Sequence, residues 1–215
     1  MSITPLIELH YLPTLEYFCL LLKHKGCIIE THEHFQRRTF RSRTPILTDK
    51  GPLLLNLSLQ GGNKGSYKQH IQEILIDTKS QSTKKHWRTL QTAYSRAPFF
   101  EHYSPFFEPL FLSPPDTLFE FNHQLLTMCL RLTQIDIEIS FSKDFVKASQ
   151  SIQDDYRGFI LPNQSFEQRS WYRPIRYNQV FGEEFIPNLS IVDLLFNAGP
   201  QSHDILYQSI EKEVS

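Results

Sequence analysis

The sequence is short of cysteine, of glycine and of long hydrophobic stretches. Its 215 residues include 3 Cys and 8 Gly, and no two cysteines form a C-x-x-C pair. This scarcity excludes a disulfide-rich scaffold and a collagen-like chain, and it is typical of a reduced cytoplasmic protein. No apolar stretch approaches the roughly 18–20 residues that cross a bilayer, so no membrane span is predicted. The apolar segment 1–22 lacks an early Lys or Arg, which argues against a secretory signal peptide.

Several familiar motifs are also missing. The chain has no G-x-S-x-G elbow, no G-x-G-x-x-G fingerprint, no GK[ST] loop and no H-E-x-x-H helix. The sequence therefore leaves the cofactor unknown. Basic residues within 64–96 are mixed with a core-facing stripe around Trp87, so we expect no nucleic-acid partner.

Net charge is nearly absent, but only in the total. The formal charge is −1, yet residues 23–96 carry fourteen basic and five acidic groups, and residues 97–215 carry eight basic and sixteen acidic groups. Such segregation indicates either an anionic ligand or a complementary packing of the two halves. Composition does not decide between them.

Periodicity predicts a mixed α/β fold. A helix at 14–25 lies between apolar strands, Asp49-Lys50-Gly51-Pro52 separates two β-type runs, and Thr117-x-x-Glu120 has capping-box spacing before an apolar stripe. The predicted strands are 6–11, 27–35, 44–48, 53–59, 70–76 and 137–140. The later helices are one marked by Trp87, Leu90 and Tyr94, which must stop before Pro98, and those at 117–132, 189–197 and 203–212. We therefore predict a single domain over residues 1–215, with an N-terminal β-α-β unit, a hairpin and a mainly helical C-terminal half.

The segment THEHFQRRTFRSR, residues 31–43, is the strongest candidate for ligand binding. Arg41 and Arg43 are two apart, so in an extended segment both can offer forked donors to one phosphate or carboxylate. The alternative is an arginine-rich edge that is solvated or paired with acids. His10, His32 and His34 form a possible metal-ligand set, but H-x-H on a strand is common without metal, and His32 is the better candidate as a general base.

The run FIPNLSIVDLLFNAGPQS, residues 185–202, contains four polar side chains in an apolar setting. Asn188, Ser190, Asp193 and Asn197 suit the capping of a helix. The same helix N-terminus presents N–H groups that can bind an anion. Both interpretations remain open, because a cap can also fix the geometry of a site.

Several blocks together make the chain similar to the WbqC-like family of bacterial proteins. They are LHYLPTLEYF at 9–18, the H-E…RRTFRSR segment at 32–43, GPLLLNLSL at 51–59, HWRTLQTAYSRAPFFEHY at 86–103 and FIPNLSIVDLLFNAGPQS at 185–202. The family is associated with loci for O-antigen and other surface polysaccharides. The resemblance implies a cytoplasmic role in making or modifying a glycan precursor. It also implies that the polar residues of these blocks are candidate site residues, namely Arg41, Arg43, Asn188, Ser190, Asp193 and Asn197.

Two functional hypotheses follow. The first is a transferase acting on a nucleotide-linked sugar or an acyl or aminoacyl donor, an anionic small molecule held by Arg41, Arg43, Asn188, Ser190 and Asn197. His32 and Asp193 are then the candidate acid and base. The second is a non-catalytic binding or assembly protein of the same pathway, with the oligomeric state left open. Exposed aromatic residues across 99–107 would favour the second hypothesis.

Overall fold

A parallel sheet and a helix form the centre of the computed structural model, which describes residues 4–61, 69–146 and 154–210. The strands are β1 (Leu6–Ile7), β2 (Gly26–Ile29) and β5 (Glu138–Phe141), in the order β1-β2-β5. Both pairings are parallel. Helix α1 (Leu15–His24) connects β1 to β2. The predicted β-α-β unit is therefore confirmed, but its strands are shorter than the predicted 6–11 and 27–35, so His10, His32 and His34 lie beyond the strand ends.

Helix α1 lies inside the fold. Its residues from Leu15 to Leu22 are all buried, as expected for a stretch that is apolar apart from Glu16. After β5 the chain returns to β1, on the side of β1 that β2 leaves free, and Asp155 there forms a parallel bridge with Leu6. This bridge brings the segment after β5 next to the first strand.

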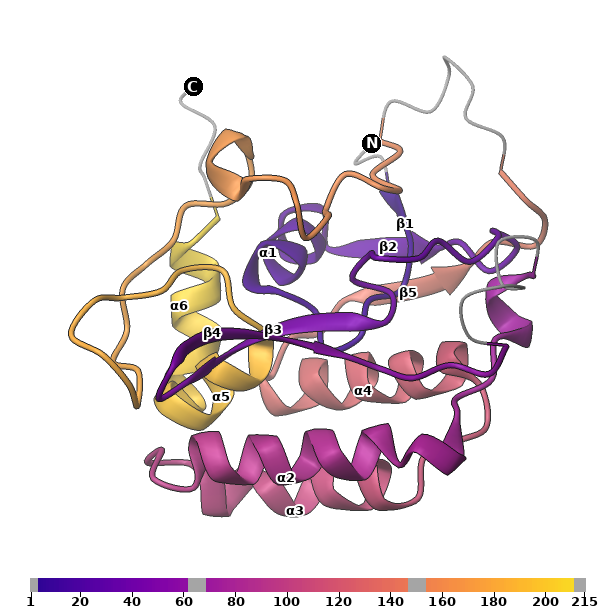
Figure 1. Cartoon of the computed structure of the whole chain (residues 1–215). Helices are drawn as coiled ribbons and strands as arrows, with labels where there is room; N and C mark the ends of the chain where they lie inside the picture. Colours follow the sequence, from indigo (N-terminus) through magenta and orange to yellow (C-terminus); the bar gives the residue numbers. More distant parts are fainter. Residues whose placement is uncertain (1–3, 62–68, 147–153, 211–215) are drawn as a thin grey trace, which may run out of the picture.

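A separate hairpin crosses the molecule between the sheet and the lower helices (Figure 1). Its strands, β3 (Arg43–Thr48) and β4 (Gly51–Asn56), are antiparallel. The turn uses Asp49 and Lys50, and Thr48 Oγ1 donates to the carbonyl oxygen of Gly51 at 2.8 Å. The predicted hairpin is confirmed, with its second strand beginning two residues earlier than expected.

The later part of the chain is mainly helical, as predicted. Figure 1 shows α2 and α3 side by side, with α4 between them and the sheet and with α5 and α6 at one end. The bounds are α2 (Ser82–Tyr94), α3 (Phe100–Leu112), α4 (Leu118–Leu132), α5 (Ile191–Ala198) and α6 (Ser202–Gln208). Short 3-10 helices occupy Ile71–Glu73, Thr78–Ser80, Phe166–Gln168 and Gly199–Gln201. Among residues 4–61, 69–146 and 154–210, no helix is both long and apolar enough to cross a membrane.

Local capping explains where two of these helices begin. Thr117 Oγ1 accepts a hydrogen bond from the Glu120 N–H at 3.2 Å, which confirms the predicted start of α4. Ser190 Oγ accepts from the Val192 N–H at 3.5 Å at the start of α5. Such side-chain acceptors satisfy N–H groups that have no partner inside the helix.

The strand predicted over residues 70–76 is wrong. The segment contains the 3-10 helix Ile71–Glu73 with only isolated bridges around it. Ile71, Ile74 and Ile76 are buried, and the spacing of three between the first two suits a 3-10 turn rather than a strand, whose side chains alternate.

Candidate functional site

Polar side chains follow the carboxyl ends of the parallel strands. Glu8 comes directly after β1, Glu30 after β2 and Ser142 after β5. Arg157 follows the bridge that Asp155 makes beside β1. Parallel strands end at the same edge of a sheet, and ligands of open α/β sheets bind outside that edge. These residues therefore mark the candidate site.

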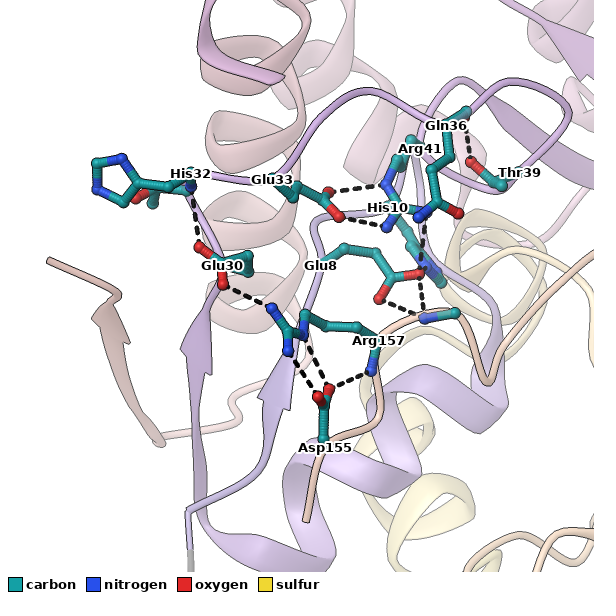
Figure 2. A network of polar contacts seen from close by, with 12 residues as sticks. Glu8, His10, Glu30, His32, Glu33, Gln36, Thr39, Arg41, Asp155 and Arg157 are labelled. Atoms are coloured by element: carbon teal, nitrogen blue, oxygen red, sulfur yellow. Dashed lines mark hydrogen bonds and ion pairs between the residues drawn. The ribbon is translucent and has the colours of Figure 1, made fainter. Parts of the chain in front are cut away.

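Arg41 lies at the centre of this edge and is fully buried. Its Nε donates to Glu33 Oε1 at 2.7 Å and its Nη2 to Glu33 Oε2 at 2.5 Å. Its Nη1 is 3.2 Å from Glu8 Oε1. One guanidinium thus bridges two carboxylates, with His10 beside Glu8 (Figure 2). We call Glu8, His10, Glu33 and Arg41 the Arg41 cluster.

A tight turn within residues 31–43 determines which of its arginines are buried. Thr39 Oγ1 donates to the carbonyl oxygen of Gln36 at 2.8 Å, and Arg38 adopts a positive φ of 60°. After this turn Arg41 enters the interior, where Asn122 Nδ2 of α4 donates to its carbonyl oxygen at 2.8 Å. Arg38 stays exposed.

The two carboxylates of the Arg41 cluster have opposite pKa shifts. Burial acts to raise the pKa of Glu8, but Arg41 and then His10 outweigh it and lower this pKa to about 2. Burial raises the pKa of Glu33 in spite of Arg41, and the negative charges of Glu8 and Glu30 add to the rise. Pairs of carboxyl groups that differ in this way are typical of acid–base sites. Glu8 is therefore the stronger acid of the two, and Glu33 takes up a proton more readily.

A second ion-pair cluster lies next to the first. Arg157 Nη1 donates to Glu30 Oε2 at 2.8 Å, and its Nε and Nη2 donate to the two oxygens of Asp155 at 2.9 and 2.6 Å. Glu30 Oε1 in turn accepts from Ser142 Oγ at 2.7 Å. Figure 2 shows this Arg157 cluster, Glu30, Asp155 and Arg157, beside Glu8. The Gly158 N–H joins the two clusters, since it donates to Glu8 Oε2 at 3.1 Å.

An open cleft of about 1400 Å³ borders both clusters. Its charged lining residues are Glu33, Arg37, Arg38, Arg43, Asp77, Asp155 and Arg157. The carboxylates of Glu33 and Asp155 already bind arginines within the clusters. The cleft therefore offers an anion several guanidinium groups, with the buried carboxylate of Glu33 in its wall.

The two arginines singled out by the sequence lie in different environments. Arg41 is buried between carboxylates, whereas Arg43 is half-buried, lines the cleft and donates its Nε to Asn56 Oδ1 at 3.1 Å. Of the pair, Arg43 is the one placed to contact a ligand directly. Arg41 holds Glu33 in position.

Asp193 is buried in the core of the C-terminal region, on α5. Its Oδ1 accepts from Tyr94 Oη at 2.9 Å, and its Oδ2 accepts from Tyr177 Oη at 2.6 Å and from Gln179 Nε2 at 2.9 Å. Burial raises the pKa of Asp193, although these three donors act in the opposite direction. The carboxylate is thus enclosed by donors, and its catalytic role stays a prediction.

Asn188 and Ser190 connect the start of α5 to the start of α1 and the segment before it, whereas Asn197 bonds within α5. Asn188 accepts from the Glu16 N–H at 2.9 Å and donates to Glu16 Oε1 at 2.8 Å, which caps α1 from the far end of the chain. Ser190 Oγ donates to the carbonyl oxygen of Leu12 at 2.9 Å. Asn197 Nδ2 donates to the carbonyl oxygen of Asp193 at 2.8 Å. Asn188 and Ser190 therefore act as caps, as the sequence suggested, and a role of the three residues in ligand binding stays a prediction.

The three histidines of the possible metal set lie apart. His10 is buried beside Glu8. The imidazole of His32 points away from the Arg41 cluster in Figure 2, and exposed His34 stacks on His70 with ring centroids 4.7 Å apart. Within the part of the chain that the structure describes, no group of three or more His, Cys, Asp or Glu side chains is arranged to hold a metal ion.

Sequence reasoning missed most of the acidic residues of the site. Glu8, Glu30 and Asp155 do not form a motif, and Arg157 lies far along the chain from its partner Glu30. One signal was available, because Glu8 is a charged residue inside the apolar strand predicted over residues 6–11. A systematic search for such positions would have identified it.

Comparison with known proteins agrees with the resemblance. The profile of the WbqC-like protein family matches residues 9–158 and 163–205. The chain is also 28% identical to "Uncharacterized protein Rv1507c" of Mycobacterium tuberculosis (strain ATCC 25618 / H37Rv), over 228 residues that cover 94% of this chain and 96% of the relative. No solved structure is significantly similar. Because the profile covers both the β-α-β unit and the C-terminal helices, the chain belongs to the WbqC-like protein family.

Proposed function

We propose that this protein is a transferase that binds an anionic small molecule, such as a nucleotide-linked sugar or an acyl or aminoacyl donor, in the cleft beside the Arg41 cluster. The carrying observation is that an arginine-lined cleft of about 1400 Å³ opens at the carboxyl edge of the parallel sheet and contains Glu33. The family association with surface polysaccharides suggests a step in making a glycan precursor. Residues 1–215 would act as one cytoplasmic domain, and the free buried thiols of Cys19, Cys27 and Cys129 suit that compartment.

Binding would rest on the guanidinium groups of the cleft wall. Guanidinium forks match the oxygens of phosphate and carboxylate groups, and their charge-assisted hydrogen bonds are stronger than neutral ones. Arg43 is half-buried, so part of its ordering and desolvation is already complete before a ligand arrives. It is the first residue to test.

Catalysis would rest on Glu33. In the proposed reaction the acceptor's hydroxyl or amine transfers its proton to the Glu33 carboxylate while its oxygen or nitrogen bonds to the transferred group, and the bond to the donor's leaving group breaks. A carboxylate with a raised pKa is suited to this role. We prefer Glu33 to His32 and Asp193, because Glu33 lines the cleft.

The aromatic run that follows α2 also favours an enzyme over a binding-only protein. Phe100, Tyr103 and Phe107 are buried and Phe99 is half-buried. Only Phe106 of this group is exposed, at 41%. The run therefore belongs mainly to the core, and it does not supply the broad apolar patch that a docking surface would need.

Two measurements test the proposal. Thermal-shift screening of UDP-, GDP- and dTDP-linked sugars and coenzyme A esters should identify stabilising ligands, because a ligand that binds only the folded state raises its stability. Calorimetric titration should then show about tenfold to hundredfold weaker binding for Arg43→Ala, from about 1.5–3 kcal/mol per charge-assisted bond. Arg88→Ala, an exposed change on α2, is the matched control. If Arg43→Ala binds the ligand as tightly as the wild type does, the cleft is not the binding site.

The Glu33→Gln variant separates an enzyme from a binding protein. If Glu33 accepts a proton, release of the nucleoside diphosphate should fall by about 10²- to 10⁴-fold with binding retained within a few fold. Arg43-dependent binding without turnover in the wild type would favour the non-catalytic alternative.

A further inference from the structure

One exposed aromatic side chain lines this cleft among its charged groups. Phe145 lies four residues after the end of β5 and lines the cleft. Its side chain is 51% exposed, the largest value among the exposed large apolar residues in the described part of the chain. A single exposed aromatic ring on a surface needs no explanation, but this one lies next to charged groups that suit an anionic ligand.

The ring has a rigid, charged neighbour. The guanidinium carbon of Arg157 is 5.3 Å from the Phe145 ring centroid, which is within the range of a cation–π contact. Arg157 is itself fixed by Glu30 at 2.8 Å and by Asp155 at 2.9 and 2.6 Å. With two carboxylates bound, Arg157 is poorly placed to serve as a phosphate anchor. It supports the ring instead.

We propose that the exposed part of Phe145 stacks on the nucleobase of a nucleotide donor, with Arg157 as its fixed support. This inference rests on the proposed function and narrows the donor to nucleotide-linked compounds. The phosphates would then contact the arginines of the wall, Arg43 among them. Part of the ring is available for stacking, since the residue Phe145 is 51% exposed.

A nucleotide can contact both the Phe145 ring, through its base, and the arginines of the cleft wall, through its phosphates. An anion without a base can contact only the arginines. Base–aromatic stacking is worth about 1–3 kcal/mol per base and tolerates every base. Asn56 and Ser58 also line the cleft, and their side chains offer hydrogen-bonding groups of both kinds. We therefore expect a nucleotide to bind more tightly than its inorganic phosphate part alone.

The test compares UDP and GDP with inorganic pyrophosphate by calorimetric titration. The Phe145→Ala variant should bind both nucleotides about 5- to 150-fold more weakly, which is the stacking energy converted to affinity, and should bind pyrophosphate as the wild type does. Phe145→Leu keeps apolar bulk without a planar ring and should weaken nucleotide binding nearly as much as Phe145→Ala. Phe145→Trp should keep the affinity and show fluorescence quenching when UDP is added.

A matched control exists on another face. Phe106 is 41% exposed and has Arg131 at 5.7 Å from its ring centroid, so Phe106→Ala removes a similar pair and should leave nucleotide affinity unchanged. If pyrophosphate binds as tightly as UDP, or if Phe145→Ala weakens both equally, the stacking inference is overturned while the anion-binding proposal stands. If neither binds and Arg43→Ala has no effect on any screened ligand, both proposals fail.

Discussion

Replacing Arg41 by methionine should expose how much stability depends on one buried guanidinium. The side chain of Arg41 is fully buried and joins the carboxylates of Glu8 and Glu33. Arg41→Met keeps much of the apolar volume but leaves two carboxylates without their cation. Breaking a buried ion pair in this way costs about 3–5 kcal/mol, so the free energy of unfolding at pH 7 should fall by that amount.

The pH dependence of this loss is equally specific. In the wild type the pKa of Glu8 is lowered to about 2 from 4.5, so its stabilising contribution is complete above pH 4.5 and is lost as pH falls from 4.5 to about 2. A shift of that size corresponds to about 3 kcal/mol. Without Arg41, burial dominates and both carboxyl groups protonate more easily, which removes the buried negative charge. The fall in the free energy of unfolding caused by Arg41→Met should therefore be smaller at pH 4 than at pH 7.

Urea unfolding followed by circular dichroism at pH 7 and pH 4 measures both effects. The triple variant with Arg41→Met, Glu8→Gln and Glu33→Gln is the companion, because it removes the charges together and should recover part of the stability. A loss below about 1 kcal/mol, as for a surface ion pair, would refute the reasoning. So would an equal loss at the two pH values, because buried carboxylates could not then be its cause.

Three further predictions concern stability measured by urea unfolding. Burial lowers the pKa of His86 to about 4 from 6.5, so the wild type should lose about 3 kcal/mol as pH falls from 6.5 to below 4, and His86→Phe should lack this part of the pH dependence. Asn188→Ala should cost about 1 kcal/mol, because it removes the cap of α1. Gly199→Ala should cost more than about 1 kcal/mol, since Gly199 has φ 56° and an added Cβ would lie 2.5 Å from the Phe99 ring.

Controls for these predictions are available in the same chain. His102 is exposed, so His102→Phe should keep the wild-type pH dependence, and a similar slope in His86→Phe would contradict the argument from burial. Asn178 is exposed, and Asn178→Ala should cost less than Asn188→Ala. Gly182 also has a positive φ, of 81°, but its added Cβ would meet nothing nearer than 3.7 Å. Equal losses at Gly182 and Gly199 would show that the Phe99 contact is unimportant.

Local signals were sufficient for much of the fold. The apolar stripe and capping box of α4, the Gly-Pro break of the hairpin and the opening β-α-β unit all depend on residues close together in the sequence. Helix α3 was not foreseen, because Pro105 and Pro109 lie within it and proline removes a helical hydrogen bond. The helix persists because Phe107 and Phe111 bury one face, while both prolines lie on the exposed side.

For the site, the sequence by itself determined that residues 31–43 bring several arginines to the end of a strand, and that Asn188 and Ser190 can cap helices. Only the tertiary structure decided that Arg41 goes inside, that Arg43 lines the cleft and that Gly158 reaches Glu8, 150 residues away along the chain. The physical reason is the separation along the chain of the residues that each interaction joins. Periodicity and capping arise between near neighbours in sequence, whereas burial, ion pairing and the pKa values that follow from them depend on which distant segments the chain brings together.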